Sequence, residues 1–338
     1  MLTSSDAARA PIEAELESHR RALTGYCYRM LGSGSEAEDA VQETMVRAWR
    51  ASDRLEARGA LKSWLYRIAS NVCFDMLANS QRRAQPMDLA SPSSAESALG
   101  HGLPEHAWVQ PIADSRVLAP ESDPADVADS RETLRLAFVA ALQHLPPRQR
   151  AVLVLREVLR WQASEVAELL ETSVASVNSA LQRARATLDG LDLDTSGPAS
   201  VDEEQQELLG RYVDAFERYD ITALVALLHE DASFSMPPFP LWVRGPEEVG
   251  RFMLGQGIHC RGSRLIPTSA NGGPAVAVYH PAAPGTWEPW AIVVVEMSGG
   301  RIAGLHHFLY AELFEAFGLP PRLEEEHAGE PDQLEQRP

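Results

Sequence analysis

The sequence predicts a multidomain protein in which two all-α units, a helical bundle and then a helix-turn-helix, precede an α+β domain. Apolar residues recur at helical spacing over residues 12–85 and again over 129–190, and a Pro-rich stretch separates the two regions. After residue 203, two helical segments precede a series of strand-like runs that Gly, Pro and Asn divide. The length of 338 residues suits two or three domains of ordinary size.

Composition narrows the class of protein. Hydrophobic residues at 45% and charged residues at 23% exclude wholesale disorder. No apolar run reaches the roughly 18 residues that a transmembrane helix needs, and no basic leader precedes an apolar segment at the N-terminus. The three cysteines, Cys27, Cys73 and Cys260, are far apart, which indicates a reducing cytosol and neither a disulfide framework nor a zinc site. We expect a soluble, cytoplasmic chain without a metal or cofactor.

The net charge of −18 is unevenly distributed along the chain. Residues 201–338 hold 9 Arg against 21 Asp and Glu, a balance of −12, which leaves −6 for the first 200 residues. The segment from Arg58 to Arg83 is locally basic, with five Lys and Arg against one acid. The acidic total therefore does not exclude a nucleic-acid partner for the N-terminal part.

The first helical unit, residues 12–85, is predicted to contain a helix over 36–50. Ser35 is placed to cap this helix, with Glu38 three residues further on. The apolar face consists of Ala40, Val41, Thr44, Met45, Ala48 and Trp49. The outward stripe consists of Asp39, Gln42, Glu43 and Arg47 beside Val46. Such a stripe is either a docking surface or an ordinary solvated helix face.

A second helix, over about 60–79, combines cations with aromatic rings. Lys62, Arg67 and Asn71 lie beside Trp64, Tyr66 and Phe74, off or at the margin of a Leu61, Leu65 and Ile68 stripe. Rings stack on unpaired bases while Lys and Arg hold phosphates, so the pattern indicates a single-stranded nucleic-acid site. The alternative is that Trp64 and Phe74 widen the core face.

Residues 86–128 are predicted to be a linker, because six prolines interrupt them and Arg116 is their only basic residue. Trp108 is a large aromatic side chain in this polar stretch, where exposure to water would be costly. It indicates either a docking contact with another domain or packing within the first unit.

The second helical unit, residues 129–190, ends in a helix-turn-helix pattern with helices over 164–170 and 174–188. Thr172 or Ser173 is placed to cap the second helix, whose apolar stripe runs from Val174 to Leu188. The opposite face consists of Ala175, Ser176, Asn178, Ser179, Gln182, Arg183 and Arg185. Small polar side chains can approach base edges and arginines can reach phosphates or guanine. The same pattern also fits an amphipathic hairpin with a solvated face.

A short linker, 191–202, leads into the third domain, 203–319. Helices over 203–219 and 221–229 precede the strand-like runs ASFSM, SRLIPTSA, PAVAVYH, PWAIVVVEM and RIAGLHHFLY. The tail, 320–338, is acidic and is predicted to be disordered.

The helical units resemble the two conserved domains of bacterial extracytoplasmic-function (ECF) sigma factors of the sigma-70 family. The matching segments are AEDAVQETMVRAWRA, LKSWLYRIASNVCFDMLANSQRR and LPPRQRAVLVLREVLRWQASEVAELLETSVASVNSALQRARATL. The resemblance implies that Asp39, Gln42, Glu43 and Arg47 dock on core RNA polymerase. It also implies that the minus-ten promoter element is engaged by Lys62, Trp64, Arg67 and Asn71. The minus-thirty-five element would be read by Ala175, Ser176, Ser179, Gln182, Arg183 and Arg185.

This sequence departs from the family pattern at the helix-turn-helix. Glu171 stands where the family often has Gly, and Asn178 and Ala180 stand where it often has a basic residue. The family's promoter preference is therefore not transferred. The phrases VNSALQRAR and WVQPIADS, residues 108–115, instead resemble a subfamily with an added C-terminal domain.

The third domain resembles SnoaL-like members of the nuclear-transport-factor-2 superfold, in which a curved sheet surrounds a conical pocket. The matching segments are RYVDAFERYDITALVALLHEDASFSMPP, LWVRGPEEV and GGRIAGLHHFLYAELFEAFGLP. The candidate pocket residues are Asp231, His259, Tyr279, Trp290, His306 and His307. On a strand only one of the two adjacent histidines can face the pocket. A pocket histidine can be an acid, a base or a structural residue, and we find no pair that indicates an enzyme.

The sequence thus favours a sigma factor whose fused SnoaL-like domain regulates it through intramolecular contact, to which the acidic C-terminal balance would contribute. Its partners would be core RNA polymerase, promoter DNA and an unidentified small ligand, but no membrane. Two alternatives are a SnoaL-like isomerase or hydrolase tethered to a DNA-binding helical module, and a repressor that senses a ligand.

Overall fold

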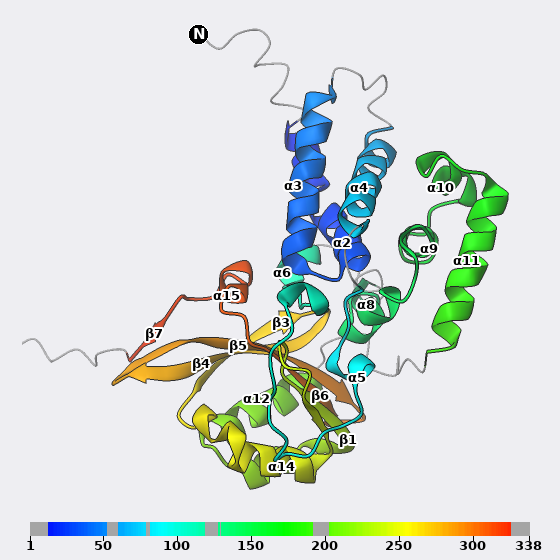
Figure 1. The fold of residues 1–338 in the computed structure, drawn as a ribbon. Coiled ribbons are helices and arrows are strands. Elements are labelled where there is room, and N and C mark those ends of the chain that lie inside the picture. Colours follow the sequence, from blue (N-terminus) through cyan, green and yellow to red (C-terminus); the bar gives the residue numbers. More distant parts are fainter. Residues whose placement is uncertain are drawn as a thin grey trace, which may run out of the picture.

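The computed structural model describes residues 13–52, 60–78, 82–118, 128, 130–191 and 203–325. Figure 1 shows two groups of helices standing on one side of a curved sheet, with further helices on the opposite side. Among the described residues, no helix is long and apolar enough to cross a bilayer.

The N-terminal unit consists of α2 (Arg20–Leu31), α3 (Gly34–Arg50) and α4 (Leu61–Leu77). The two helices predicted over 36–50 and 60–79 are confirmed, but the predicted cap is wrong. Ser33, not Ser35, accepts the hydrogen bond from the Glu36 amide. The reason is that Gly32 ends α2 in the left-handed region, so the next helix begins at once.

The linker is partly helical and runs across the sheet domain. It contains α5 (Pro86–Leu89), η3 (Glu105–Ala107) and α6 (Asp114–Val117). Between them, the Ser93 amide donates to the Trp242 carbonyl at 2.7 Å and the Leu103 amide to the Pro238 carbonyl at 2.9 Å. These backbone bonds fix residues 93–103 against the sheet domain.

The helix-turn-helix unit comprises α8 (Leu136–Leu142), α9 (Pro147–Leu153), the π-turn η4 (Val154–Val158), α10 (Ala163–Leu169) and α11 (Val174–Asp189). Ser173 caps α11 by accepting from the Ser176 amide at 3.1 Å, as the sequence predicts. Val177, Leu181 and Ala184 are buried. Val174 is instead 43% exposed, because it is the first residue of α11 and lies outside the packed stripe.

The sheet domain is α+β, as predicted, and contains α12 (Glu203–Glu217), α13 (Ile221–Ala226), α14 (Pro246–Leu254), η5 (Gln256–Cys260) and α15 (Leu313–Ala316). Its sheet has the order β2-β1-β6-β5-β4-β3, and only β1 and β6 pair in parallel. The strands are β1 (Leu228–Ser235), β2 (Trp242–Arg244), β3 (Arg264–Ala270), β4 (Gly273–Ala283), β5 (Thr286–Ser298) and β6 (Arg301–Phe308). Strand β7 (Leu323–Glu324) pairs with β5, so the start of the tail is ordered, contrary to the prediction; residues 326–338 lie outside the described part.

The two faces of the sheet belong to different cores. On β4, Val276 and Val278 point into a core closed by α12 and α14, whereas Ala275, Ala277 and Tyr279 point the other way. This second face joins a continuous apolar core that includes residues of α2, α3, α8 and α9. The helical units therefore share a core with the sheet domain and are not joined to it by a linker alone.

Candidate functional site

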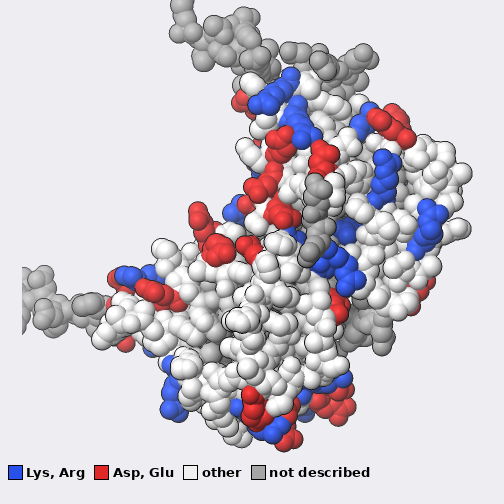
Figure 2. All heavy atoms as spheres, viewed as in Figure 1, with Lys and Arg blue, Asp and Glu red and all other residues white. Residues whose placement is uncertain are grey.

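The outward face of α3 carries the four residues that the resemblance assigns to polymerase docking. Asp39, Gln42, Glu43 and Arg47 are all exposed. The Arg47 Nε atom lies 2.7 Å from a Glu43 carboxylate oxygen, and an Asp75 carboxylate oxygen on α4 lies 3.5 Å from Nη1 of the same guanidinium. In Figure 2, acidic side chains gather along the part of the surface that α3 forms.

An apolar groove of about 360 Å³ adjoins this acidic face. Leu16, Met45, Val46 and Trp49 line it, with Gln42 at its side. Trp49 is 42% exposed, so its predicted place in the buried stripe is wrong. It lies on the last turn of α3, next to the buried Ala48, on the side of the helix that lines the groove. A large apolar residue at the end of an apolar stripe is the signal that could have found this groove.

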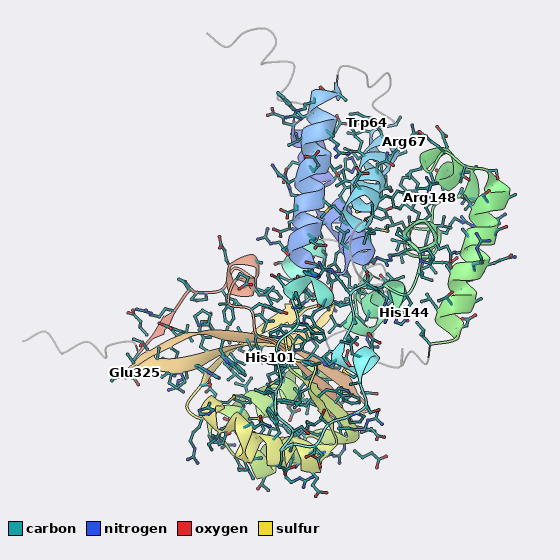
Figure 3. All side chains as sticks on the ribbon, in the orientation of Figure 1. Trp64, Arg67, His101, His144, Arg148 and Glu325 are labelled. Carbon is teal, nitrogen blue, oxygen red and sulfur yellow. The ribbon has the colours of Figure 1, made fainter. Side chains whose placement is uncertain are left out.

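The α4 face assigned to the minus-ten element is partly covered by the helix-turn-helix unit. The Lys62 ammonium lies 5.5 Å from the ring centre of Trp161, which precedes α10. The Arg67 guanidinium donates to the Glu168 carbonyl at 3.3 Å, while Asn71 is exposed. Figure 3 shows Trp64 and Arg67 on the side of α4 that faces α10.

The aromatic residues of α4 have divided roles. Tyr66 is buried between Tyr26 and Trp161, with ring centres 5.2 Å and 5.1 Å away, so it is a core residue and not a stacking platform. Trp64 and Phe74 are half-buried, and the Arg148 guanidinium of α9 lies 5.8 Å from the Phe74 ring centre. The cation–aromatic face of α4 is thus in contact with α9, α10 and the segment between them.

The recognition face of α11 is exposed. Ala175, Ser176 and Ser179 lie at its N-terminal end, and Gln182, Arg183 and Arg185 follow towards its C-terminal end. The Arg185 guanidinium forms an exposed ion pair with Glu157 at 2.6 Å.

A hairpin turn of the sheet domain, missed by the sequence reasoning, joins all three parts of the chain. Asn271 and Gly272 connect β3 to β4 with φ values of 55° and 77°, as an Asn-Gly turn between strands requires. The buried Asn271 amide donates to the Tyr28 hydroxyl at 2.6 Å and to the Leu134 carbonyl at 2.8 Å. Its oxygen accepts from the Ile112 amide at 3.2 Å. We call this turn and its three partners the clasp.

Gly272 fits the clasp only without a side chain. A Cβ atom there would lie 2.7 Å from the Arg131 Cα atom. Its amide donates to the Asp114 carboxylate at 2.7 Å. Burial of Asp114 raises the pKa of its carboxyl group from 3.8 to about 6.

This pKa predicts how stability depends on pH. The folded state favours the protonated form of the Asp114 carboxyl group. The contribution of this group to the free energy of unfolding is therefore fully present below about pH 4 and is lost as the pH rises through 6. Asp114→Asn, which stays neutral, should therefore raise the free energy of unfolding by up to about 3 kcal/mol at pH 7.5 and by little at pH 4. Urea unfolding of both proteins between pH 4 and 8 measures the difference, and a difference that does not vary with pH would contradict the assignment.

Trp108 is completely buried, and its position fits both of its interpretations. It lies in the core shared by α2, α3 and the sheet, and its backbone pairs with Ala84. The Arg83 guanidinium donates to the Trp108 carbonyl at 2.8 Å and forms an ion pair with Glu36. The linker is thus anchored on the N-terminal unit at Trp108 and on the sheet domain at 93–103.

The sheet domain encloses a cavity of about 290 Å³ between its inner face and α14. His259, Trp290 and His307 line it, together with His280, which the sequence reasoning missed. The signal that could have found His280 is the alternation of side chains along a strand, since His280 is two residues from Val278, which points to the inner face. His280 stacks on Trp290 with ring centres 4.0 Å apart. Burial lowers the pKa of His280 to about 4 and that of His307 to about 3, so both rings are neutral.

Three of the predicted pocket residues lie elsewhere. Tyr279 is on the opposite face of β4, where its ring packs on Phe314 and its hydroxyl donates to the Pro320 carbonyl. His306 also faces away from the cavity. Its Nδ1 atom lies 2.9 Å from the Ser235 hydroxyl, and its Nε2 atom lies 3.3 Å from a Glu296 carboxylate oxygen. Asp231 is exposed on β1. Strand alternation therefore places His307 in the cavity and excludes His306, as the parity argument expects.

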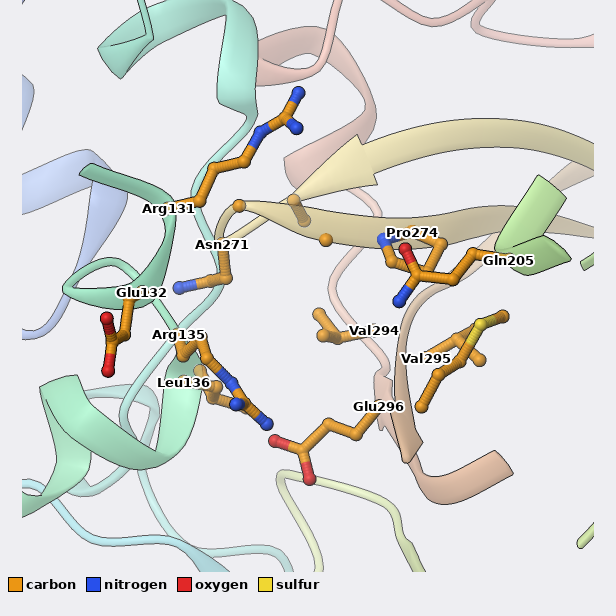
Figure 4. Close-up of a pocket in the computed structure, with 14 residues that line it drawn as sticks. Arg131, Glu132, Arg135, Leu136, Gln205, Asn271, Pro274, Val294, Val295 and Glu296 are labelled. Carbon is orange, nitrogen blue, oxygen red and sulfur yellow. The ribbon is translucent and has the colours of Figure 1, made fainter. Parts of the chain in front are cut away.

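A smaller polar cavity of about 140 Å³ lies beside the clasp, between the segment that precedes α8 and the sheet. Figure 4 shows the Arg135 side chain pointing towards Glu296 of β5. Opposite charges thus face each other where the helix-turn-helix unit meets the sheet domain. Within the described residues there is no group of three His, Cys, Asp or Glu arranged to hold a metal ion.

Comparisons with known proteins match all three parts of the chain. Residues 16–83 match the family described as Sigma-70 region 2, residues 135–188 match Sigma-70, region 4, and residues 209–305 match the SnoaL-like domain. The chain is 42% identical to the ECF RNA polymerase sigma factor SigG of Mycobacterium tuberculosis, over 94% of this chain and 86% of that protein. It is 30% identical to SigJ of the same organism over 72% of each. The crystal structure of SigJ has the same fold, with a TM-score of 0.58 and 24% identity, covering 91% of this chain and 99% of that one.

Proposed function

We propose, because this chain belongs to the ECF RNA polymerase sigma factors and carries a SnoaL-like domain, that its sheet domain controls access to the promoter-binding helices. The family gives the function of the chain: a sigma factor directs transcription initiation by core RNA polymerase. Membership of the family favours a sigma factor over the two alternatives, a tethered isomerase or hydrolase and a repressor. The residues that perform these tasks, and the control by the sheet domain, are our proposal.

The observation that carries the proposal is the contact between α4 and the helix-turn-helix unit. Lys62 and Arg67, which would engage the minus-ten element, already have partners in Trp161 and the Glu168 carbonyl. Trp161 and α10 cover part of the face on which unpaired bases would stack. We infer that the structure represents a closed state and that promoter binding requires the two helical units to separate.

The closed state is stabilised by contacts that no single domain could make. The buried Arg29 guanidinium of α2 donates to the Thr133 hydroxyl at 2.7 Å, and that of Arg150 donates to the Met30 carbonyl. The clasp adds hydrogen bonds from the sheet domain to both helical units. Since the sheet domain bonds to both units at once, it favours the arrangement in which they lie together. We therefore propose that it inhibits, and that its release permits initiation.

Initiation by this chain is tested on the full-length protein with core polymerase, and control by the sheet domain is tested separately by a variant that releases the clasp. Run-off transcription from fragmented genomic DNA, with the transcripts mapped by sequencing, does not depend on a known promoter sequence. We expect a defined set of start sites that is absent with core polymerase alone. Deleting residues 201–338 is the less suitable test, because it would expose the core that the sheet shares with the helical units. No chain-dependent start sites and no association with core polymerase would contradict initiation by this chain.

Arg183 on the exposed face of α11 supplies a prediction about DNA reading. If its guanidinium bonds to a guanine, Arg183→Ala should weaken holoenzyme binding by ~1–3 kcal/mol, and only at promoters with that base. If it contacts a phosphate, the loss should be independent of sequence and the salt dependence should fall by about one unit. Titrations at several salt concentrations measure both. Arg218→Ala, which removes an exposed arginine directly after α12, is the control. Equal binding by the two variants would exclude Arg183.

A further inference from the structure

The cavity in the sheet domain has an apolar wall without a fixed charge. Phe234, Met236, Phe252 and Leu309 are among the residues that line it, and its described lining includes no Asp, Glu, Lys or Arg. A charged molecule would lose its hydration there without gaining an ionic partner. The cavity therefore suits an uncharged molecule, and its volume of about 290 Å³ lies near the lower end of the range for small-molecule pockets.

Two buried nitrogens provide polar contacts within this apolar wall. The Nδ1 atom of His307, a residue only 2% exposed, and the Nε2 atom of His280 have no hydrogen-bond partner within the described residues. Buried polar atoms without a partner are rare, because each has lost its hydrogen bonds to water without a replacement. Both rings are neutral, so each can exchange a hydrogen bond with a hydroxyl or carbonyl group. The stacked rings of Trp290 and His280 both line the cavity, and they give part of its wall a flat shape that favours a planar molecule.

The linker forms one wall of the cavity. Leu99 lines it, and the Gln256 side chain, also in the lining, donates to the Ala95 carbonyl at 2.7 Å and the Ser97 carbonyl at 2.9 Å. The same linker reaches the N-terminal unit at Trp108. A molecule that fills the cavity would pack against Leu99 and hold residues 93–103 in place.

We propose that this cavity binds an uncharged, planar, mainly apolar molecule with a hydroxyl or carbonyl group, and that binding stabilises the closed state through Leu99. The hydroxyl or carbonyl group bonds to His307 and His280, and the rings pack on Trp290. Because the cavity wall includes the linker of the closed state, a molecule that binds there favours that state. The second part rests on the proposed function, whereas binding itself does not.

Binding is tested with the full-length protein and the fluorescent neutral probe N-phenyl-1-naphthylamine. Three competitors of similar shape separate the contributions: 2-naphthol has a hydroxyl group, naphthalene has none, and 2-naphthoate is charged. We expect 2-naphthol to displace the probe at a concentration at least tenfold lower than naphthalene, and 2-naphthoate to be weakest. In His307→Leu, the advantage of 2-naphthol over naphthalene should shrink, because only His280 can still bond to the hydroxyl group. Absence of probe binding, or strongest displacement by 2-naphthoate, would overturn the ligand class. The order in the wild-type protein decides this even if the variant fails to fold.

The effect on the linker is measured by hydrogen exchange and transcription. Saturating 2-naphthol should slow exchange of the amides in residues 93–103 at least threefold, and reduce run-off transcription by the holoenzyme. Leu99→Ser should weaken both effects. Unchanged or faster exchange with 2-naphthol bound would overturn the coupling. Probe binding is measured on the chain without polymerase. Absence of probe binding would therefore not bear on transcription initiation, and absence of initiation would not bear on the binding result.

Discussion

Reversing the charge of Asp39 and Glu43 should abolish association with core RNA polymerase while the protein remains folded. Both side chains are exposed on α3, beside the groove that Met45, Val46 and Trp49 form. Surface substitutions of this kind usually change stability by less than ~0.5 kcal/mol, and loss of the Glu43–Arg47 ion pair adds a similar amount. A mismatch of charge at the centre of an interface costs several kcal/mol, which is a loss of affinity of more than about a hundredfold. A pull-down with core polymerase measures the effect of the Asp39→Arg, Glu43→Arg double variant.

The sheet domain offers a matched control for this experiment. Glu207 and Asp214 are also exposed on a long helix, α12, and Asp214 forms an i,i+4 ion pair with Arg218, as Glu43 does with Arg47. The Glu207→Arg, Asp214→Arg variant changes the net charge by the same amount. It should bind core polymerase as the wild type does. Retained binding by a folded α3 variant, or equal loss by both variants, would remove α3 from the interface.

Local patterns in the sequence were sufficient for the helices and for the order of the domains. The cap at Ser173 and the buried Val177, Leu181 and Ala184 follow from spacing alone, because these features depend on residues within one or two turns. The parity of His306 and His307 was sufficient to show that only one of them could face the cavity. Trp49 was misplaced because the spacing of a helix does not reveal whether another element covers each position of its apolar stripe.

The relations between the domains could not be predicted in this way. The sequence places Tyr66 in a cation–aromatic pattern. The structure shows that it is a core residue, because it packs on Trp161, which lies far along the chain. Tyr279 reads as a pocket residue because the sequence does not reveal that the second face of the sheet is covered by other helices. The Asn-Gly turn predicts a hairpin and nothing more, since its three partners lie in segments 137 to 243 residues away.

The hydrogen bonds of Asn271 should decide how often the closed state opens. Asn271→Gly should keep the turn, because glycine adopts the left-handed conformation of residue 271 without strain. It removes three hydrogen bonds and leaves the Ile112 amide and the Leu134 carbonyl buried without partners. Each such loss costs about 1–3 kcal/mol, and together they should shift the closed equilibrium by on the order of a hundredfold.

We therefore expect Asn271→Gly to raise run-off transcription by at least about tenfold and to speed hydrogen exchange in α4 and α10. The control is Glu171→Gly, which makes the same backbone change at another left-handed residue, φ 52°, whose side chain is exposed. It should leave exchange in α4 unchanged, because no contact between the domains is lost. The two readouts separate the steps of the argument. Faster exchange with unchanged transcription would mean that contact with the sheet domain does not limit initiation. Slower exchange or reduced transcription would mean that the clasp holds the sigma units in a productive arrangement rather than an inhibited one.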